Sequence, residues 1–517
     1  MNQLVARMSI EEKVGQLIVV GFDGTTVNST IRANISQRFV GGVALFARNI
    51  QSPQQAARLT NDLQQLAQET KHQIPLFMAT DQEGGRVSRL KKGATVFSGN
   101  MALGATRSGK LAGQAGRITG IELAAAGINL NFAPVMDVNN NPCNPVIDRR
   151  SFGESPDLVA RLGTAYTGGL QENGVLATAK HFPGHGDTTV DSHTDLPTVK
   201  HDLERIQAIE LKPFRAAIEA GVAAVMTAHI LYPALDADRP ATLSRAILTD
   251  LLRGELGFSG LIITDDMGMK AIDERYTAGE AAVMAIEAGA DMVLTLWTLA
   301  NQVEVFNALV SAVKNGTIPE DRIDQSVGRI LKNKEACGAL DWRSIDPATA
   351  IKAVGSESHR QIAGAIAAQA ITVVQNRNRI LPLNTDISPL IIGSSNILFN
   401  LLKVRYAKSI NARIPTEPSI GDILPRLILQ AEDANVVIAG IVKQQGELIH
   451  QLSTMTQTPI IVIGLGSPYS LRCCPDIAAA LAAYDGHYAS VLAAVKVIVG
   501  ESNAHGKLPI RLGPVDQ

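Results

Sequence analysis

Short, almost continuously apolar runs recur along the first two thirds of the chain, and each is followed by a longer segment with helical periodicity. Strands that are apolar on both faces are typical of parallel sheets covered on both sides. The eight runs span residues 16–22, 41–46, 74–82, 128–138, 174–182, 222–230, 260–266 and 290–296. Eight such units favour a (β/α)8 TIM-like barrel, and an open doubly wound sheet is the alternative.

The junctions between helices and strands repeat one design. In "AIEAGVAAVM" (217–226) and "AIEAGADMVL" (285–294), a helix end is followed by a glycine and then by a buried strand. Glycine adopts the left-handed conformation that ends many helices without strain. Gly127 and Gly174 stand in the same position in their own units. We therefore assign residues 1–340 to the barrel domain.

The pattern changes after Cys337. Residues 341–370 are interpreted as a linker and a connecting helix. A second alternation of apolar runs follows, "ITVVQN", "SPLIIGS", "ANVVIAGIV" and "TPIIVIGLG". It predicts a smaller parallel sheet with helices on both faces, an αβα sandwich over residues 371–517. Because this region contains no cluster of charged residues or histidines, we expect a structural or oligomerising role for it.

Composition limits the partners. The chain has 517 residues, of which 46% are apolar, and its 47 Lys and Arg nearly balance its 49 Asp and Glu. Such a balance argues against nucleic acid or an anionic membrane as a partner and favours a small or neutral ligand. The chain has neither an export-type N-terminus nor an apolar run of about 18 residues, so we expect no membrane segment. The oligomeric state is not determined by the sequence.

The four cysteines suggest a reducing compartment. Cys143, Cys337, Cys473 and Cys474 lack the spacing of a metal site, and the adjacent pair is a poor disulfide candidate. We expect reduced thiols and a cytoplasmic location. An export segment removed from the chain would leave the same pattern.

Polar side chains follow several of the predicted strands, where barrels carry their chemistry. They are Asp81, Glu83, Asp137, Asn139, Lys180, His181, His229, Asp265 and Asp266. The loop after the fifth strand, "KHFPGHGDTTVDSHTDLP" (180–197), adds three histidines and three aspartates. The joint presence of these groups indicates a site at one end of the barrel.

Three interpretations of this loop compete. His181, His185 and His193 with Asp187 and Asp191 offer metal ligands, but their spacing fits no standard ligand pattern, so we expect no metal. A hydrogen-bonded surface loop is the second interpretation. In the third, Asp191 and His193 leave an extended segment on the same side, and the carboxylate orients an imidazole that acts as general acid and base.

The series "DQEGGRVSR" (81–89), "KHFPGHGDTTVDSH" (180–193), "MTAHI" (226–230) and "ITDDM" (263–267) resembles that of family 3 glycoside hydrolases, and more closely their bacterial β-N-acetylglucosaminidase branch. The resemblance runs through about residues 8–335. It implies a barrel followed by an αβα sandwich and no cofactor. Less specifically, "GKLPIRL" near the end resembles a recurrent strand of that second domain.

The resemblance also implies roles for residues. Asp265 would be the nucleophile that forms a covalent glycosyl-enzyme, as retaining glycosidases require. His193 would be the acid and base, with Asp191 as its orienting partner. The residues that would bind the sugar are Asp81, Arg89, Arg150, Lys180 and His181.

Neighbours of these residues receive other interpretations. Strand alternation turns Asp266 away from Asp265 and gives it a supporting role. Glu83 and Arg86 are expected to form a structural ion pair, and Gly84 and Gly85 a tight turn.

The predicted activity is therefore the removal of terminal β-linked N-acetylglucosamine from small glycans, such as peptidoglycan fragments. A β-glucosidase or β-xylosidase of the same family, an N-acetylglucosaminide phosphorylase and a non-catalytic sugar-binding protein are the alternatives. A phosphorylase is considered because a neutral histidine repels phosphate less than a carboxylate would.

Overall fold

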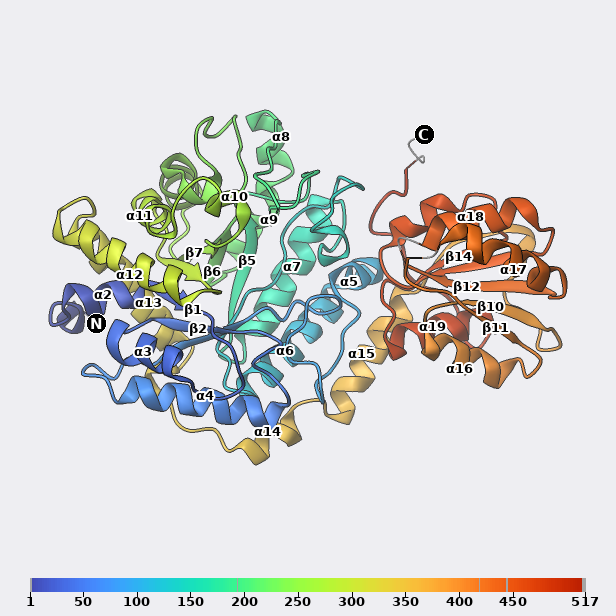
Figure 1. Cartoon of the computed structure of the whole chain (residues 1–517), viewed down its shortest axis with the longest axis horizontal. Helices are drawn as coiled ribbons and strands as arrows, with labels where there is room; N and C mark the ends of the chain where they lie inside the picture. Colours follow the sequence, from blue (N-terminus) through green and yellow to red (C-terminus); the bar gives the residue numbers. More distant parts are fainter. Residues whose placement is uncertain (1, 193, 418, 443–444, 514–517) are drawn as a thin grey trace.

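In the computed structural model, which describes residues 2–192, 194–417, 419–442 and 445–513, eight parallel strands close into a barrel (Figure 1). The strands follow one another around it in chain order. They are β1 (Ile18–Val20), β2 (Gly42–Leu45), β3 (Phe77–Thr80), β4 (Leu130–Asn131), β5 (Leu176–Phe182), β6 (Ala224–Thr227), β7 (Leu261–Asp266) and β8 (Met292–Thr295). Each lies within one of the eight predicted runs, so the barrel prediction is confirmed.

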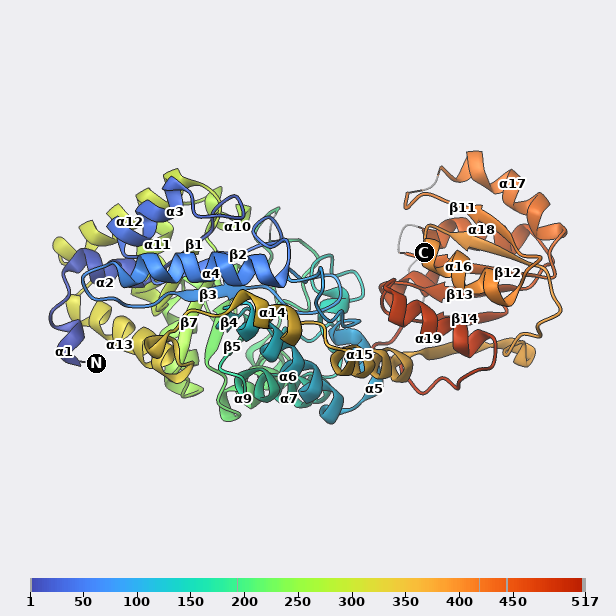
Figure 2. The ribbon, with the colours of Figure 1, turned by 90° about the horizontal axis from the view of Figure 1, so that it is seen from below.

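Helices surround the barrel and cover the outer faces of its strands (Figures 1 and 2). The helices of this part are α1 (Asn2–Val5), α2 (Ile10–Gln16), α3 (Ser29–Arg38), α4 (Pro53–Gln68), α5 (Asn100–Thr106), α6 (Gly109–Ala125), α7 (Pro156–Gln171), α8 (Leu203–Ala208), α9 (Leu211–Glu219), α10 (Lys270–Asp273), α11 (Ala278–Ala288), α12 (Leu299–Lys314) and α13 (Glu320–Ala336). A π-helical segment, Ala246–Glu255, lies between β6 and β7. One continuous apolar core fills the barrel and the space beneath these helices.

Local sequence explains where the helices begin and end. Ser9 and Glu12 form a capping box at the start of α2, and Thr277 and Glu280 form another at the start of α11. Each box satisfies backbone N–H groups that have no partner inside the helix. At the predicted helix ends, Gly127, Gly174, Gly221 and Gly289 all have positive φ angles, between 72° and 127°. The junction design predicted from the sequence is therefore confirmed.

The connection to the second domain holds two helices, α14 (Pro347–Ala353) and α15 (Glu357–Ala370), rather than the single helix expected. Pro347 occupies the first turn of α14, where its missing N–H costs nothing. The side chain of Ser356 caps the start of α15. The connection is thus two capped helices, of which α15 packs against α5.

The described part of the second domain is a six-stranded sheet in the order β11-β10-β12-β13-β14-β9. The strands are β9 (Thr372–Asn376), β10 (Pro389–Gly393), β11 (Ile410–Arg413), β12 (Val436–Ile441), β13 (Ile460–Gly464) and β14 (Ala479–Ala482). The helices are α16 (Asn396–Arg405), α17 (Ile420–Glu432), α18 (Gly446–Met455) and α19 (Tyr488–Ile498). Apolar clusters on both faces of the sheet confirm the predicted sandwich.

Two expectations about this domain are wrong. The sheet is mixed, because β9 pairs antiparallel with β14. The segment "GKLPIRL" (506–512) forms no strand, although Gly506 donates to the carbonyl of Ile371 and Lys507 to that of Ala105. It therefore runs between the two domains instead of extending the sheet.

The four cysteines are all free, as predicted. Among the described residues, no helix combines the length and the apolar character needed to span a bilayer.

Candidate functional site

A cavity of about 850 Å³ lies where the carboxyl ends of the barrel strands meet. Pockets for small ligands in proteins commonly have this size. Residues from seven of the eight strands or the loops after them line the cavity, and the candidates among them are Asp81, Arg89, Arg150, Lys180, His181, Asp191 and Asp265. The structure thus brings together all predicted site residues that it describes. His193 lies outside the described residues, so the predicted contact between Asp191 and His193 remains a prediction.

Buried charges cluster on one wall of the cavity. The ammonium of Lys180 lies 2.8 Å from a carboxylate oxygen of Asp81 and 2.7 Å from one of Glu83. The guanidinium of Arg150 donates two hydrogen bonds to the same Glu83 carboxylate, at 2.9 and 2.8 Å. Arg89 lies 3.6 Å from the second oxygen of Asp81. Three cations and two carboxylates therefore fix one another at the tips of β3 and β5.

Glu83 is the centre of this cluster, and its predicted pairing with Arg86 is wrong. The Glu83 side chain is almost completely buried between Arg150 and Lys180. Burial alone would raise the pKa of this carboxyl, but the two cations hold it well below its usual range. Glu83 therefore stays ionised and orients two of the predicted sugar-binding cations. Arg86 is exposed at the rim of the cavity.

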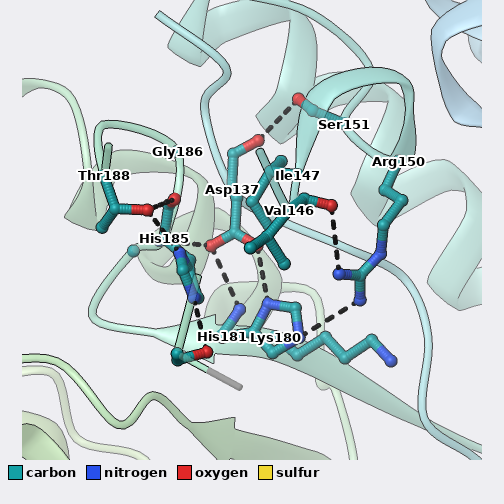
Figure 3. A network of polar contacts seen from close by, with 12 residues as sticks. Asp137, Val146, Ile147, Arg150, Ser151, Lys180, His181, His185, Gly186 and Thr188 are labelled. Carbon is teal, nitrogen blue, oxygen red and sulfur yellow. Dashed lines mark hydrogen bonds and ion pairs between the residues drawn. The ribbon is translucent and has the colours of Figure 1, made fainter. Parts of the chain in front are cut away.

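Asp137 positions two histidines of the fifth-strand loop (Figure 3). One of its oxygens lies 2.8 Å from Nδ1 of His181, and the other accepts the backbone N–H groups of His181 and His185. Because a carboxylate can only accept, Nδ1 of His181 carries the proton, and Nε2 faces Arg150 at 3.4 Å. Asp137 is thus a supporting residue, as expected for ring nitrogens that need a defined tautomer.

The carboxylate proposed as nucleophile lies at the end of β7. Burial alone would raise the pKa of Asp265, but His181, His229, the N–H of Asp266 and Lys180 bring it below its ordinary value. Asp266 donates that backbone hydrogen bond at 2.8 Å. The environment therefore favours an ionised Asp265, which is the form that can attack carbon.

Asp266 has the opposite environment. Its side chain is buried and accepts hydrogen bonds from the N–H groups of Leu296, at 3.2 Å, and Gly268, at 3.4 Å. Burial and the neighbouring charge of Asp265 raise its pKa to about 6. These contacts tie the ends of β7 and β8 together, in agreement with the supporting role predicted for Asp266.

Among the described residues of the loop after β5, the metal ligands considered above do not come together. Nδ1 of His185 lies 2.9 Å from the Thr188 hydroxyl and its Nε2 lies 3.0 Å from the Ser192 hydroxyl. Burial lowers the pKa of His185 to about 4, so its ring is neutral near pH 7. Asp187 points elsewhere and pairs with His201 at 2.6 Å. His185 therefore supports the loop rather than acting as a metal ligand.

Within the described residues, one group has ligand atoms close enough for a metal ion, Asp187 with His201 and Glu210. Arg205 already lies 3.6 Å from Asp187 and 3.3 Å from Glu210. A cation at that place would compete with the guanidinium, so the group is better described as an ion-pair network.

The second domain holds one segment of the site. The 3-10 helix η1 (Asp148–Arg150) contributes Arg150 to the cavity and is held from behind. The Ser467 hydroxyl donates to Asp148 at 2.6 Å, and Arg149 donates to the carbonyl of Tyr484 at 3.0 Å. Asp148 has a φ angle of 42°, in the left-handed region that favours glycine. No local sequence pattern signals this contribution of Ser467 and Tyr484.

Three further residues of the cavity were not predicted, namely Phe46 and Arg48 after β2 and Trp297 after β8. Their rings and guanidinium stack on one another at the rim. Their positions at or directly after the ends of predicted strands were the available signal. Aromatic residues in apolar runs are more often part of the core, which hides that signal.

Known proteins are similar to this chain over most of its length. The family model "Glycosyl hydrolase family 3 N terminal domain" matches residues 9–333. Beta-hexosaminidase A from Pseudoalteromonas piscicida is 38% identical over 472 residues, which cover 87% of this chain and 77% of that protein. A solved family 3 beta-N-acetylglucosaminidase from Paenibacillus sp. str. FPU-7 has a TM-score of 0.91 and 38% identity, over 98% of this chain and 100% of that chain. A beta-glucoside phosphorylase bound to 2FGlc has a TM-score of 0.86 and 25% identity, over 99% and 96%.

Proposed function

Because the chain belongs to glycoside hydrolase family 3, and is therefore a glycoside hydrolase, we propose that it is a retaining exo-acting β-N-acetylglucosaminidase. Its substrates are small glycans with a terminal β-linked N-acetylglucosamine, such as peptidoglycan fragments. The names of the relatives support the sugar, since Beta-hexosaminidase A and the Paenibacillus beta-N-acetylglucosaminidase are similar to almost the whole chain. The observation that carries the mechanism is an ionised Asp265 in the cavity that Asp191 also lines.

In the proposed first step, a carboxylate oxygen of Asp265 attacks the anomeric carbon, and the bond to the leaving oxygen breaks. His193, oriented by Asp191, gives a proton to that oxygen. In the second step His193 takes a proton from water, which attacks the anomeric carbon and releases Asp265. The configuration is retained because the anomeric carbon is inverted twice.

The buried wall of the cavity would hold the terminal sugar. Asp81 accepts hydrogen bonds from hydroxyls, while Lys180, Arg89 and Arg150 donate to hydroxyls or to the acetamido carbonyl. Because these groups are already fixed by one another, little ordering is needed when the sugar binds. Glu83 and Asp137 contribute by keeping the cations and His181 in place.

The test combines turnover and trapping. The chain should hydrolyse an aryl β-N-acetylglucosaminide and much less of the corresponding aryl glucoside. A slow fluorinated N-acetylglucosamine substrate should label one peptide, and that peptide should contain Asp265. Asp265→Ala should abolish both turnover and labelling, whereas His193→Ala should mainly slow substrates with poor leaving groups. A label on another residue, or unchanged turnover by Asp265→Ala, would refute the proposal.

A phosphorylase is the second candidate, because the beta-glucoside phosphorylase shares the fold over almost the whole chain. In that case phosphate, instead of water, attacks the glycosyl-enzyme. Turnover in phosphate buffer would then give a sugar 1-phosphate. The proposed hydrolase gives free N-acetylglucosamine in phosphate and in a buffer without it.

A further inference from the structure

The indole ring of Trp297 is exposed to solvent at the rim of the cavity. Trp297 follows β8 directly, lines the cavity and is 58% exposed. A tryptophan in contact with water loses the stabilisation that burial of its large apolar surface would give. An exposed indole at this position therefore lowers the stability of the fold unless a ligand covers the ring.

The ring is nevertheless held in one orientation. The guanidinium of Arg48 lies 4.4 Å from its centroid, and Phe46 lies behind at a ring-to-ring distance of 5.4 Å. Arg48 itself is fixed by Asp23, at 2.7 Å. The Trp297 side chain also lies close to the Asp266 carboxylate, whose pKa it lowers against the larger effect of burial. The indole is thus preorganised next to the residue that follows the proposed nucleophile.

A purely structural stack explains this arrangement less well. The Arg48 side chain is only 26% exposed, and Phe46 is half-buried, so these two lie inside the stack. Trp297 is the outermost member and contributes most of the exposed surface. If the stack only closed the end of the barrel, we would expect the large Trp297 ring to be buried and the charged Arg48 side chain to be exposed. The free surface of the indole is the feature that a structural role leaves unexplained.

Rigid aromatic faces are suited to pyranose rings, whose axial C–H groups form an apolar face. We propose that Trp297 forms the aglycone subsite and stacks on the second sugar, the one that leaves. This inference rests on the proposed function. It follows from position, because the groups assigned to the terminal sugar, Lys180 and His181, are buried at 2% and 4% exposure, whereas Trp297 lies at the mouth. An exo-acting enzyme presents its leaving group on that side.

The test compares two substrates with Trp297→Ala and the conservative Trp297→Phe. The disaccharide N-acetylglucosaminyl-β-1,4-N-acetylglucosamine has a leaving sugar, while N-acetylglucosaminyl β-fluoride has none. Trp297→Ala should lower kcat/KM about tenfold on the disaccharide, a typical effect for loss of one stacking contact, and less than about twofold on the fluoride. Trp297→Phe should recover most of the loss because it keeps an aromatic face.

Equal losses on both substrates would overturn the proposal, because Trp297 would then act through Asp266 and the cavity wall. Unchanged kinetics on both would overturn it as well. A binding arm separates this result from failure of the proposed function. In an Asp265→Asn background, calorimetry with the disaccharide and with free N-acetylglucosamine should show that Trp297→Ala weakens only the disaccharide. Absence of that difference refutes the subsite whether or not the unaltered chain hydrolyses either substrate.

Discussion

Replacing Glu83 by glutamine should destabilise the barrel by about 3 kcal/mol, because it removes one member of a buried charge cluster. The Glu83 side chain is 1% exposed and the Lys180 side chain 2%. Lys180 keeps its 2.8 Å contact with Asp81, whereas Arg150 loses the carboxylate that accepts two of its hydrogen bonds. Most of the cost therefore comes from a guanidinium that is 12% exposed and left without its counter-ion.

Urea unfolding followed by tryptophan fluorescence measures this effect. The two tryptophans, Trp297 and Trp342, lie in the barrel and at its end, so their signal reports on that domain. The matched control is Glu172→Gln, which alters an ion pair with Arg117 whose side chains are 54% and 61% exposed. That control should cost less than about 1 kcal/mol, because water screens exposed pairs.

The pH dependence of the Glu83→Gln effect tests whether the charge cluster stabilises the barrel. Because the pKa of Glu83 is held well below its ordinary value, the carboxylate stays ionised in the folded state at pH 5. The stabilisation is present above the ordinary pKa and is lost only as the pH falls through the folded one. A loss at pH 5 and 7 no larger than that of Glu172→Gln would mean that the cluster contributes little.

Two further predictions concern the ends of β7 and the domain interface. The pKa of Asp266 is raised from 3.8 to about 6, so the unaltered protein loses stability as the pH rises through 6. Relative to it, the free energy of unfolding of Asp266→Asn should increase by up to about 3 kcal/mol between pH 4 and 7. A difference between the two proteins that does not change with pH in urea titrations would contradict this. Ser467→Ala removes the hydrogen bond to Asp148 and should lower kcat/KM several-fold by loosening Arg150. Ser490→Ala removes another interdomain hydroxyl contact, the one with Ser98, and should leave kcat/KM unchanged. Equal effects of the two variants on kcat/KM would argue against a link between Ser467 and Arg150.

The barrel could be predicted because its information is local. Each strand is a short apolar run, and a glycine after the preceding helix marks the start of the fourth, fifth, sixth and eighth strands. β11 and β14 were missed for physical reasons. β11 reads "INAR" and is largely exposed, and β14 reads "AALA", where small side chains give little strand signal. The antiparallel direction of β9 depends on its pairing with β14, which no local pattern records.

The site could be predicted as far as it depends on strand tips. Asp81, Lys180 and Asp265 follow predicted strands, and a barrel brings such positions together. The partner of Glu83 could not be predicted, because the turn at Gly84 and Gly85 carries Arg86 to the surface. Their φ angles are 90° and 56°, and the turn is closed by backbone hydrogen bonds to Val87.

Arg150 and Trp297 show the same limit. Arg150 reaches Glu83 from 67 residues away in the chain. The exposure of Trp297 depends on which residues cover it. Contacts between distant segments decide such roles, and one sequence does not encode them in its local pattern.

Helix α5 affects whether the barrel domain can be produced without the sandwich domain. Its residues Met101, Ala102 and Ala105 are almost completely buried, yet they belong to the apolar cluster of the sandwich rather than to that of the barrel. Figure 1 shows this helix at the side of the barrel that faces the sandwich. A fragment cut before β9 would carry this apolar surface uncovered into water, where it invites aggregation. Expression of the isolated barrel would therefore call for polar replacements on that helix, and its yield would report on folding before it reports on catalysis.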